Sequence, residues 1–131
     1  MDAKEYLNQY ETSQRKLKTL QQEIKYESEK LKGFSSELHS DDKSISLIKS
    51  HIYKLKCLEE EHEIICNDVL SKVRLVPDTK GVILYKRYIE LTKWEDIAEQ
   101  LSYSEKNVYH IHSQALDYLQ NMLDKEAPDQ I

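Results

Sequence analysis

Six hydrogen-bonding side chains lie close together between residues 105 and 113. They are Glu105, Lys106, Asn107, Tyr109, His110 and Ser113. On a helix that enters the major groove of DNA, side chains of these types read base edges and contact phosphates. Asn107 suits an adenine edge and Lys106 suits guanine or a phosphate, whereas Tyr109 and His110 suit phosphates or a thymine methyl group. The alternative interpretation is an ordinary polar helix face in solvent.

Residues 104–119 predict the helix that would carry these side chains. Ser104 is a favourable N-cap residue, and the amides of the first turn, aided by the helix dipole, could hold a phosphate. Apolar residues then recur at helical spacing and predict an inward face: Val108, Ile111, Ala115, Leu116 and Leu119.

A shorter helix is predicted immediately before it, beginning at Thr92. Thr92 and Glu95 have the spacing of a capping box, in which the hydroxyl accepts from the Glu95 amide and the carboxylate reaches back to the Thr92 amide. The residues expected on its inner side are Trp94, Ile97, Ala98 and Leu101. The small Ala98 permits a close approach between helices.

Ser102 and Tyr103 form the turn that we expect between these two helices. Two short helices joined by about three residues are typical of a helix-turn-helix. Thr92 and Lys93, at the start of the first helix, complete the candidate DNA-contacting residues.

A third C-terminal helix is predicted ahead of this pair. Val76 and Pro77 end the preceding segment, because proline cannot continue a helix interior and restricts the residue before it. Asp78 and Thr79 are expected to cap a helix that continues through Leu91. Its predicted inward face consists of Leu84, Tyr88 and Leu91.

The first 75 residues predict two long amphipathic helices. Apolar residues recur at heptad spacing up to about residue 32 and just beyond it, at Tyr6, Tyr10, Leu17, Leu20, Ile24, Leu31, Phe34 and Leu38, with Ser13 and Glu27 at weak seam positions. Turn formers between residues 33 and 44 predict the end of this helix and a loop. A second helix is expected from about Asp42 to Leu75, with a stripe at Ile45, Ile48, Ile52, Leu55, His62, Ile65, Val69 and Val73.

These elements predict an all-α fold with a long N-terminal antiparallel helical hairpin, similar to a coiled coil, followed by a small helix-turn-helix domain. Helices of equal length joined by a short loop can bury both stripes against each other, although pairing between chains would bury the same stripes. We favour a hairpin that also self-associates into a homo-oligomer. The expected regions are 1–76 for the hairpin, 77–124 for the DNA-binding domain and 125–131 for a flexible tail.

The charge distribution limits how such a protein could bind DNA. The net charge is −5, and residues 77–131 contain ten acidic residues but only six lysines and arginines. DNA-binding domains usually present a basic face, because releasing counterions from phosphates supplies much of their affinity. We therefore expect few ion pairs per subunit and more than one subunit on the DNA.

The remaining reactive residues do not predict a catalytic or metal site. Cys57 and Cys66 lie on opposite faces of one predicted helix, so both are expected to be buried structural thiols. The acidic run at residues 59–63 spreads around a helix, and His110 and His112 point to different sides. We expect no enzyme activity, no metal and no cofactor. With neither a predicted membrane span nor a signal peptide, a cytoplasmic protein without a membrane partner is expected.

Part of the C-terminal region is similar to a known family, which makes the expected function more specific. The resemblance is carried by Leu84-Tyr85-Lys86-Arg87-Tyr88-Ile89, Trp94-Glu95-Asp96-Ile97-Ala98-Glu99-Gln100-Leu101, Tyr103-Ser104, Val108-Tyr109, His112 and Ala115-Leu116. Residues 80–120 thereby resemble phage and prophage transcription regulators of the ArpU and RinA type, whose C-terminal part is similar to region 4 of sigma-70 factors. The resemblance implies recognition residues at Glu105, Lys106, Asn107, Tyr109 and His110. It departs at Ser102, where the family turn often holds glycine.

Three functions remain open from the sequence. The first is a sequence-specific transcription regulator, an activator of phage or mobile-element genes, with double-stranded DNA as its partner and RNA polymerase as a candidate second partner. The second is a DNA-packaging recognition subunit similar to the small subunit of a terminase. The third is a protein-interaction module that does not contact DNA, which the acidic C-terminal region favours.

Overall fold

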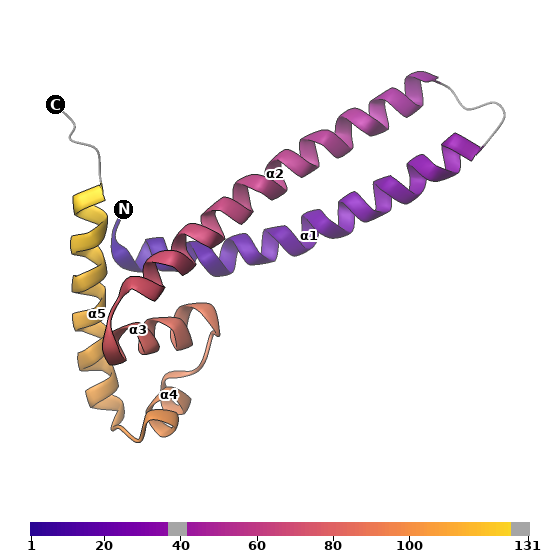
Figure 1. The fold of residues 1–131 in the computed structure, drawn as a ribbon. Coiled ribbons are helices and arrows are strands. Elements are labelled where there is room, and N and C mark those ends of the chain that lie inside the picture. Colours follow the sequence, from indigo (N-terminus) through magenta and orange to yellow (C-terminus); the bar gives the residue numbers. More distant parts are fainter. Residues whose placement is uncertain (37–41, 127–131) are drawn as a thin grey trace. The chain divides into compact units, whose positions relative to one another are not determined.

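The computed structural model describes residues 1–36 and 42–126, and these are helical and contain no strand (Figure 1). The elements are α1 (Ala3–Ser36), α2 (Asp42–Leu75), α3 (Asp78–Leu84), a π-helical turn η1 (Tyr85–Ile89), α4 (Trp94–Leu101) and α5 (Glu105–Glu126). The predicted all-α fold with a long N-terminal helix pair is confirmed. The predicted loop falls mainly at residues 37–41, outside the described residues. The predicted tail from residue 125 is helical to Glu126 and otherwise also lies outside them.

The chain divides into two compact units whose boundaries fall inside the long helices. One unit consists of residues 1–11 and 66–131, and the other of residues 12–65. We call the first the terminal unit and the second the hairpin unit. The first turns of α1 and the last turns of α2 thus belong with the C-terminal helices, although the sequence pattern placed all of residues 1–76 together.

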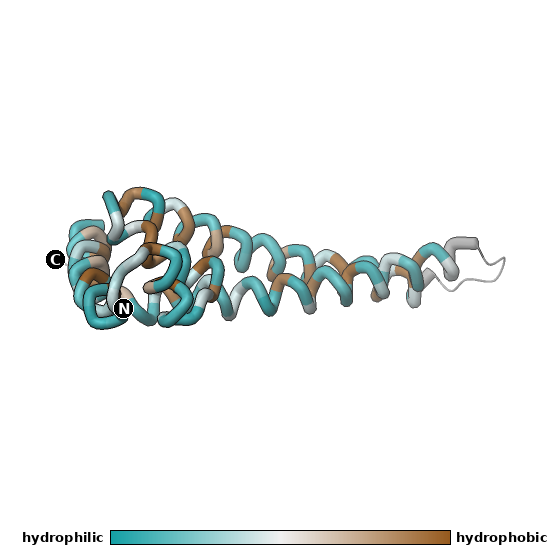
Figure 2. The backbone as a smooth tube through the Cα atoms, turned by 90° about the horizontal axis from the view of Figure 1, so that it is seen from below, coloured by the Kyte–Doolittle hydropathy of each residue, from teal (hydrophilic) through white to brown (hydrophobic). Residues whose placement is uncertain are grey.

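In the hairpin unit, α1 and α2 run antiparallel (Figures 1 and 2), and the described residues of the predicted stripes are buried or partly buried. Its buried apolar residues are Leu17, Leu20, Ile48, Ile52 and Leu55. One seam layer is polar: Ser13, only 3% exposed, has its hydroxyl 3.1 Å from Nδ1 of His62. A hydrogen-bonded polar layer in an apolar seam favours one register over others, because a slipped register would leave both groups buried and unpaired.

The terminal unit has a core, and both of its segments, residues 1–11 and 66–131, contribute to it. Its buried members are Ala3, Tyr6, Leu7, Val69, Val73, Val76, Leu84, Tyr88, Ala115 and Leu119. The start of α1 is well defined: the Asp2 carboxylate accepts from the Glu5 amide at 2.8 Å, and the Ala3 amide donates to Gln120 Oε1 at 2.8 Å. These bonds satisfy amides that a helix N-terminus leaves without intrahelical partners.

A charged network in the terminal unit joins three helices. Lys72, only 8% exposed, lies 2.9 Å from carboxylate oxygens of Asp68 and of Glu126. Tyr6 donates its phenolic hydrogen to the other oxygen of Asp68 at 2.5 Å. Burial and this bond to a carboxylate raise the pKa of Tyr6. Burial by itself would lower the pKa of Lys72, but its two carboxylate partners outweigh burial and raise it, so the ammonium remains charged and paired.

The structure corrects three details of the sequence prediction. No side chain caps α3, and Asp78 instead adopts φ 60°. The α-helical part ends at Leu84, and the chain continues as the π turn η1. A hydrogen bond of 3.0 Å from the Glu90 amide to the Tyr85 carbonyl oxygen closes this turn. Leu91 is therefore not on the buried face with Leu84 and Tyr88: it follows the turn with φ 59° and is 51% exposed. Cys66 is buried as expected, but Cys57 is exposed.

Gly81 permits α3 to approach the end of α2 closely. A Cβ atom built at Gly81 would lie 2.1 Å from the carbonyl oxygen of Val76 and 3.1 Å from its carbon. Both neighbours are backbone atoms, which cannot rotate away as a side chain can. Gly33, in α1, has no atom within 4 Å of the equivalent position.

Gly81→Ala should therefore destabilise the protein by about 2 kcal/mol or more, even though alanine in an open helix position is about 1 kcal/mol better than glycine. Urea unfolding followed by circular dichroism measures the change. Gly33→Ala is the matched control and should not destabilise. Equal effects of the two substitutions would show that the contact with Val76 does not constrain the terminal unit.

Candidate nucleic-acid interface

A second apolar cluster in the terminal unit holds α4 and α5 together. Its buried residues are Ile83, Ile97, Ala98 and Val108, with Trp94, Leu101 and Ile111 packed around them. All the residues predicted to face inward on α4 are buried or partly buried, and so are those on α5. The predicted inward faces of α4 and α5 are confirmed, and Ala98 is buried within the cluster that joins them.

The turn between α4 and α5 is closed by two backbone hydrogen bonds. Ser102 N–H donates to Glu99 O at 3.1 Å, and Tyr103 N–H donates to Ala98 O at 2.9 Å. This is the Schellman pattern, which requires a left-handed residue after the helix. Ser102 supplies it with φ 58° and ψ 39°, at the position where glycine would avoid the steric cost of a Cβ atom.

Ser104 begins α5 as predicted. Its hydroxyl oxygen accepts from the Asn107 amide at 3.1 Å, and its carbonyl oxygen accepts from the Val108 amide at 3.0 Å. The N-cap therefore fixes the backbone of the first turn, where Glu105, Lys106 and Asn107 lie.

The predicted capping box at Thr92 is wrong. The N-cap residue of α4 is Lys93, and no side chain caps this helix. The backbone of Thr92 is used differently: its amide donates to Lys86 O at 2.8 Å, and its carbonyl oxygen accepts from the Arg87 guanidinium at 3.2 Å. Thr92 is half-buried and connects α4 to η1, whereas Lys93 is exposed.

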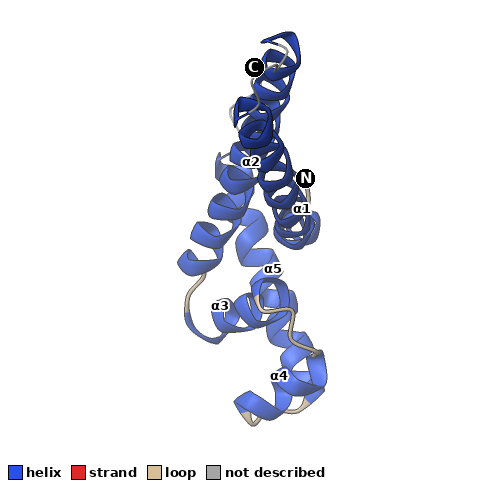
Figure 3. Cartoon of the chain, turned by 90° about the vertical axis from the view of Figure 1, so that its right-hand side faces the viewer, coloured by secondary structure: helices blue, strands red, loops and turns tan. Residues whose placement is uncertain are grey.

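The predicted DNA-contacting side chains on α5 are exposed to solvent, and Figure 3 shows where α4 and α5 lie in the terminal unit. Ser104, Glu105, Lys106, Asn107, Tyr109, His110 and Ser113 are all exposed. At about 100° per residue, Lys106, His110 and Ser113 lie on the side of α5 opposite its buried residues. Tyr109 and Glu105 lie towards one edge of that side, and Asn107 lies on the other edge. We call these seven residues the α5 surface.

One polar residue of this surface was missed by the sequence analysis. Gln114 is exposed, and its amide lies 3.3 Å from His110 Nε2. Its spacing of four residues from His110 was the available signal, because residues so spaced are neighbours on a helix. Gln114 can therefore orient the His110 ring.

Trp94 links the start of α4 to the α5 surface. Its ring contacts Tyr109, with centroids 5.1 Å apart, and meets His112 edge-on at 4.6 Å. The Arg87 guanidinium lies 4.6 Å from the centroid of the Trp94 ring. The ring contact with Tyr109 therefore fixes the start of α4, where the exposed Lys93 is the N-cap residue, against the first turns of α5.

His112 supports this aromatic group as a neutral ring. It stacks on Tyr88, and its Nε2 lies 2.8 Å from the Tyr88 hydroxyl. Burial, with smaller contributions from Lys4 and Arg87, lowers the pKa of His112 to about 4. His110, in contrast, is exposed, so the two histidines do point to different sides of α5. Among the described residues, no group of three or more His, Cys, Asp or Glu side chains could hold a metal ion.

The α5 surface and its surroundings carry mixed charge. Lys93 and Lys106 are its exposed cations, and Glu105 lies next to Lys106. The exposed acidic residues on nearby turns are Glu95, Asp96, Glu99 and Asp117. A nucleic acid could therefore meet hydrogen-bonding side chains and two cations here, but it would not meet a continuous basic surface.

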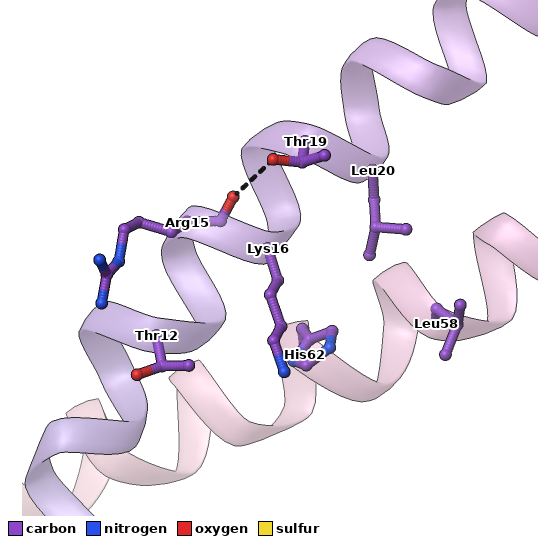
Figure 4. A pocket seen from close by; sticks show the side chains of 7 residues that line it. All are labelled: Thr12, Arg15, Lys16, Thr19, Leu20, Leu58 and His62. Carbon is purple, nitrogen blue, oxygen red and sulfur yellow. Dashed lines mark hydrogen bonds between the residues drawn. The ribbon is translucent and has the colours of Figure 1, made fainter.

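The hairpin unit has a groove of about 590 Å³ between its two helices (Figure 4). It is lined by Thr12, Arg15, Lys16, Thr19, Leu20, Leu58 and His62. In Figure 4, Arg15 points away from the groove, while Leu20 and Leu58 border it from opposite helices. His62, which lines the groove, is also the hydrogen-bonding partner of Ser13 in the polar layer.

No protein-family model, curated protein or solved structure matches this chain. Among the described residues, no helix has the length and apolar character needed to span a membrane.

Ser102→Gly should stabilise the protein by about 0.5–1 kcal/mol, because glycine removes the steric cost of φ 58°. The measurement is the shift of the midpoint in urea or thermal unfolding. Ser104→Ala is the matched control: it removes the N-cap bond to Asn107 and should destabilise by about 1 kcal/mol. A loss of stability in Ser102→Gly would contradict the assigned turn.

His112 should make the protein less stable as the pH falls from 6.5 to 4. Its pKa is about 4 in the folded protein and 6.5 in the unfolded chain, so the unfolded chain binds more protons in this window. The contribution of the neutral His112 ring to the free energy of unfolding is fully present above pH 6.5 and is lost as the pH falls towards 4. For a partly solvated ring we expect this loss to be about 1–2 kcal/mol.

Urea unfolding at several pH values would measure this loss. His112→Gln keeps a hydrogen-bonding partner for Tyr88 but does not titrate, so its stability should change less across the same window. If the free energy of unfolding changed equally with pH in the two proteins, His112 would not be a buried, neutral ring.

Proposed function

We propose that this protein is a sequence-specific DNA-binding transcription regulator that inserts α5 into the major groove. The observation that carries the proposal is the exposed polar surface at the N-terminal end of a helix fixed from behind by Trp94, Ile97 and Val108. A reading helix must be rigid, because base-edge hydrogen bonds depend on side-chain position.

Lys106 and Asn107 are the residues proposed to read bases. Asn107 can form two hydrogen bonds with an adenine edge, and Lys106 can bind guanine or a phosphate. Tyr109 and His110 are proposed to contact phosphates or a thymine methyl group, with Ser113 further along the groove. Lys93 would contact the backbone from the start of α4, because phosphate contacts commonly come from the helix that crosses the strand.

The mixed charge supports a particular mode of binding. With few exposed cations beside Glu95, Asp96 and Glu99, each subunit would neutralise few phosphates. Sequence-dependent contacts and more than one subunit must then supply the affinity. We therefore propose a homo-oligomer held together through the N-terminal helices, acting in the cytoplasm.

The biological role that we propose follows the resemblance of residues 80–120 to regulators of the ArpU and RinA type. That role is activation of phage or mobile-element genes, with RNA polymerase as a second partner. The packing of α4 and α5 supports it, because the apolar residues in the resembling segments form the cluster around Ile97 and Val108.

The proposal is tested with a DNA site selected from a random pool by the full-length protein. Lys106→Ala and Asn107→Ala should each weaken binding to that site by about 1–3 kcal/mol in a fluorescence anisotropy titration. Lys125→Ala is the matched control, because it removes an exposed charge near the far end of α5. Circular dichroism verifies that the helices remain.

Two outcomes would contradict the proposal. Unchanged affinity of both α5 variants would exclude the α5 surface as the reading element. No binding even at low salt, where phosphate contacts are strongest, would favour the protein-interaction function instead. That alternative is supported by the exposed acidic residues of α4. A large ring of subunits bound at a packaging site would identify the small-terminase function.

A further inference from the structure

The outer face of α2 carries an exposed apolar stripe within the hairpin unit. Tyr53 is 71% exposed and Ile64 is 61% exposed, and Cys57 between them is also exposed. Their spacing of four and seven residues puts them on one side of the helix. This side is opposite Ile48, Ile52 and Leu55, which are buried against α1. Ser46 and Ser50 continue the stripe with small, exposed side chains.

The charges of α2 change sign at the middle of this stripe. Residues 43–56 contain four lysines and no acidic residue, whereas residues 57–65 contain four glutamates and no lysine or arginine. In a parallel pair of α2 helices, like charges would face each other on both sides of Cys57. In an antiparallel pair centred at Cys57, the lysine half of each helix faces the glutamate half of the other.

We infer that a second copy of this chain docks on the outer face of α2, antiparallel to it, about a two-fold axis near Cys57. The apolar stripe supplies the buried surface and the reversed charge halves supply the orientation. A surface that is complementary to its own two-fold copy gives a closed dimer, because the same contact occurs twice and leaves no open end. The inference specifies the self-association proposed above and is independent of DNA binding.

The helical geometry identifies the pairs that would meet. Lys54 lies three residues before Cys57 and Glu61 four residues after it, and both fall on the same flank of the stripe at about 100° per residue. The two-fold axis therefore brings Lys54 of one copy beside Glu61 of the other, twice per dimer. On the opposite flank it brings Tyr53 beside Glu60, where the phenol can donate to the carboxylate. All four side chains are exposed in the single chain.

The axis also places the two Cys57 side chains next to each other. Packed helices have axes about 8–10 Å apart, and Cα atoms lie about 2.3 Å from each axis. Two facing Cα atoms are then roughly 3.5–5.5 Å apart, a range that overlaps the separation of a disulfide. Added diamide should therefore join two full-length chains through Cys57. Cys57→Ser should abolish the product, and Cys66→Ser should retain it, because Cys66 is buried.

Charge exchange tests the direction of pairing in DNA-free solution by sedimentation equilibrium. Lys54→Glu and Glu61→Lys should each raise the dimer dissociation constant at least tenfold. In the variant with both substitutions, the dissociation constant should lie within about threefold of that of the unmodified protein. An equimolar mixture of the two single variants should form heterodimers in native mass spectrometry, because both of its ion pairs are restored. Circular dichroism verifies that these surface changes leave the helices intact.

The inference is overturned if the protein is monomeric at all concentrations, or if it dimerises with no response to either charge change. In the second case self-association would remain but would use another surface. A double variant no better than the single variants would indicate parallel pairing and would also overturn it.

Discussion

The fixed position of α5 depends on the burial of a few side chains around Val108. Ile83, Ile97 and Ala98 surround this residue, and Trp94 closes the cluster on the side facing Tyr109. Burying an aliphatic side chain contributes about 1.5–3 kcal/mol, so a cluster of this size can hold α4, a helix of 8 residues that would not be stable alone, against α5. Because the apolar residues lie behind the helix, Lys106, Asn107 and Ser113 on its other side remain exposed.

The aromatic and charged groups beside the cluster set its orientation. Arg87 contacts the Trp94 ring and also binds the carbonyl of Thr92, so one side chain fixes both the ring and the entry to α4. Tyr88 and His112 pair behind this ring. On the far side of the terminal unit, Lys72 joins α1, α2 and α5 through its bonding network. A buried ion pair adds little net stability, but it disfavours arrangements in which one partner is left unpaired.

Periodicity was sufficient to predict most helices from the sequence. The bounds of α2 are the predicted ones, and the inward faces of α4 and α5 are confirmed, because burial of apolar side chains is strongly periodic. Local capping was predicted less well. Ser104 forms its expected bond, but Thr92 does not cap α4, because its backbone is used by Lys86 and Arg87 instead. Such competition between tertiary and local hydrogen bonds has no local sequence signal.

The same reasoning explains the other differences. The π turn at Tyr85–Ile89 depends on how Leu84 and Tyr88 reach the core, and the sequence alone predicts only an α-helix there. The contribution of Tyr6 to the terminal unit could not be separated from the heptad pattern of the hairpin, because both kinds of contact need apolar residues at similar spacing. Leu7, which is fully buried in the same core, lies outside that pattern and was missed. The exposure of Cys57 was missed because a lone cysteine does not indicate its own burial.

The interruption of the terminal unit by residues 12–65 has a consequence for how the chain folds. Residues 1–11 must meet residues 66–131, and closing a long flexible connection is entropically unfavourable and slow. The intervening segment is itself a pair of antiparallel helices (Figure 1), whose contacts become less local in sequence from the connected ends of the helices towards residues 12 and 65. If these two helices pair first, Glu11 and Cys66 come close together before the core of the terminal unit forms. Its formation would then lower the kinetic barrier for assembling the domain that carries α5.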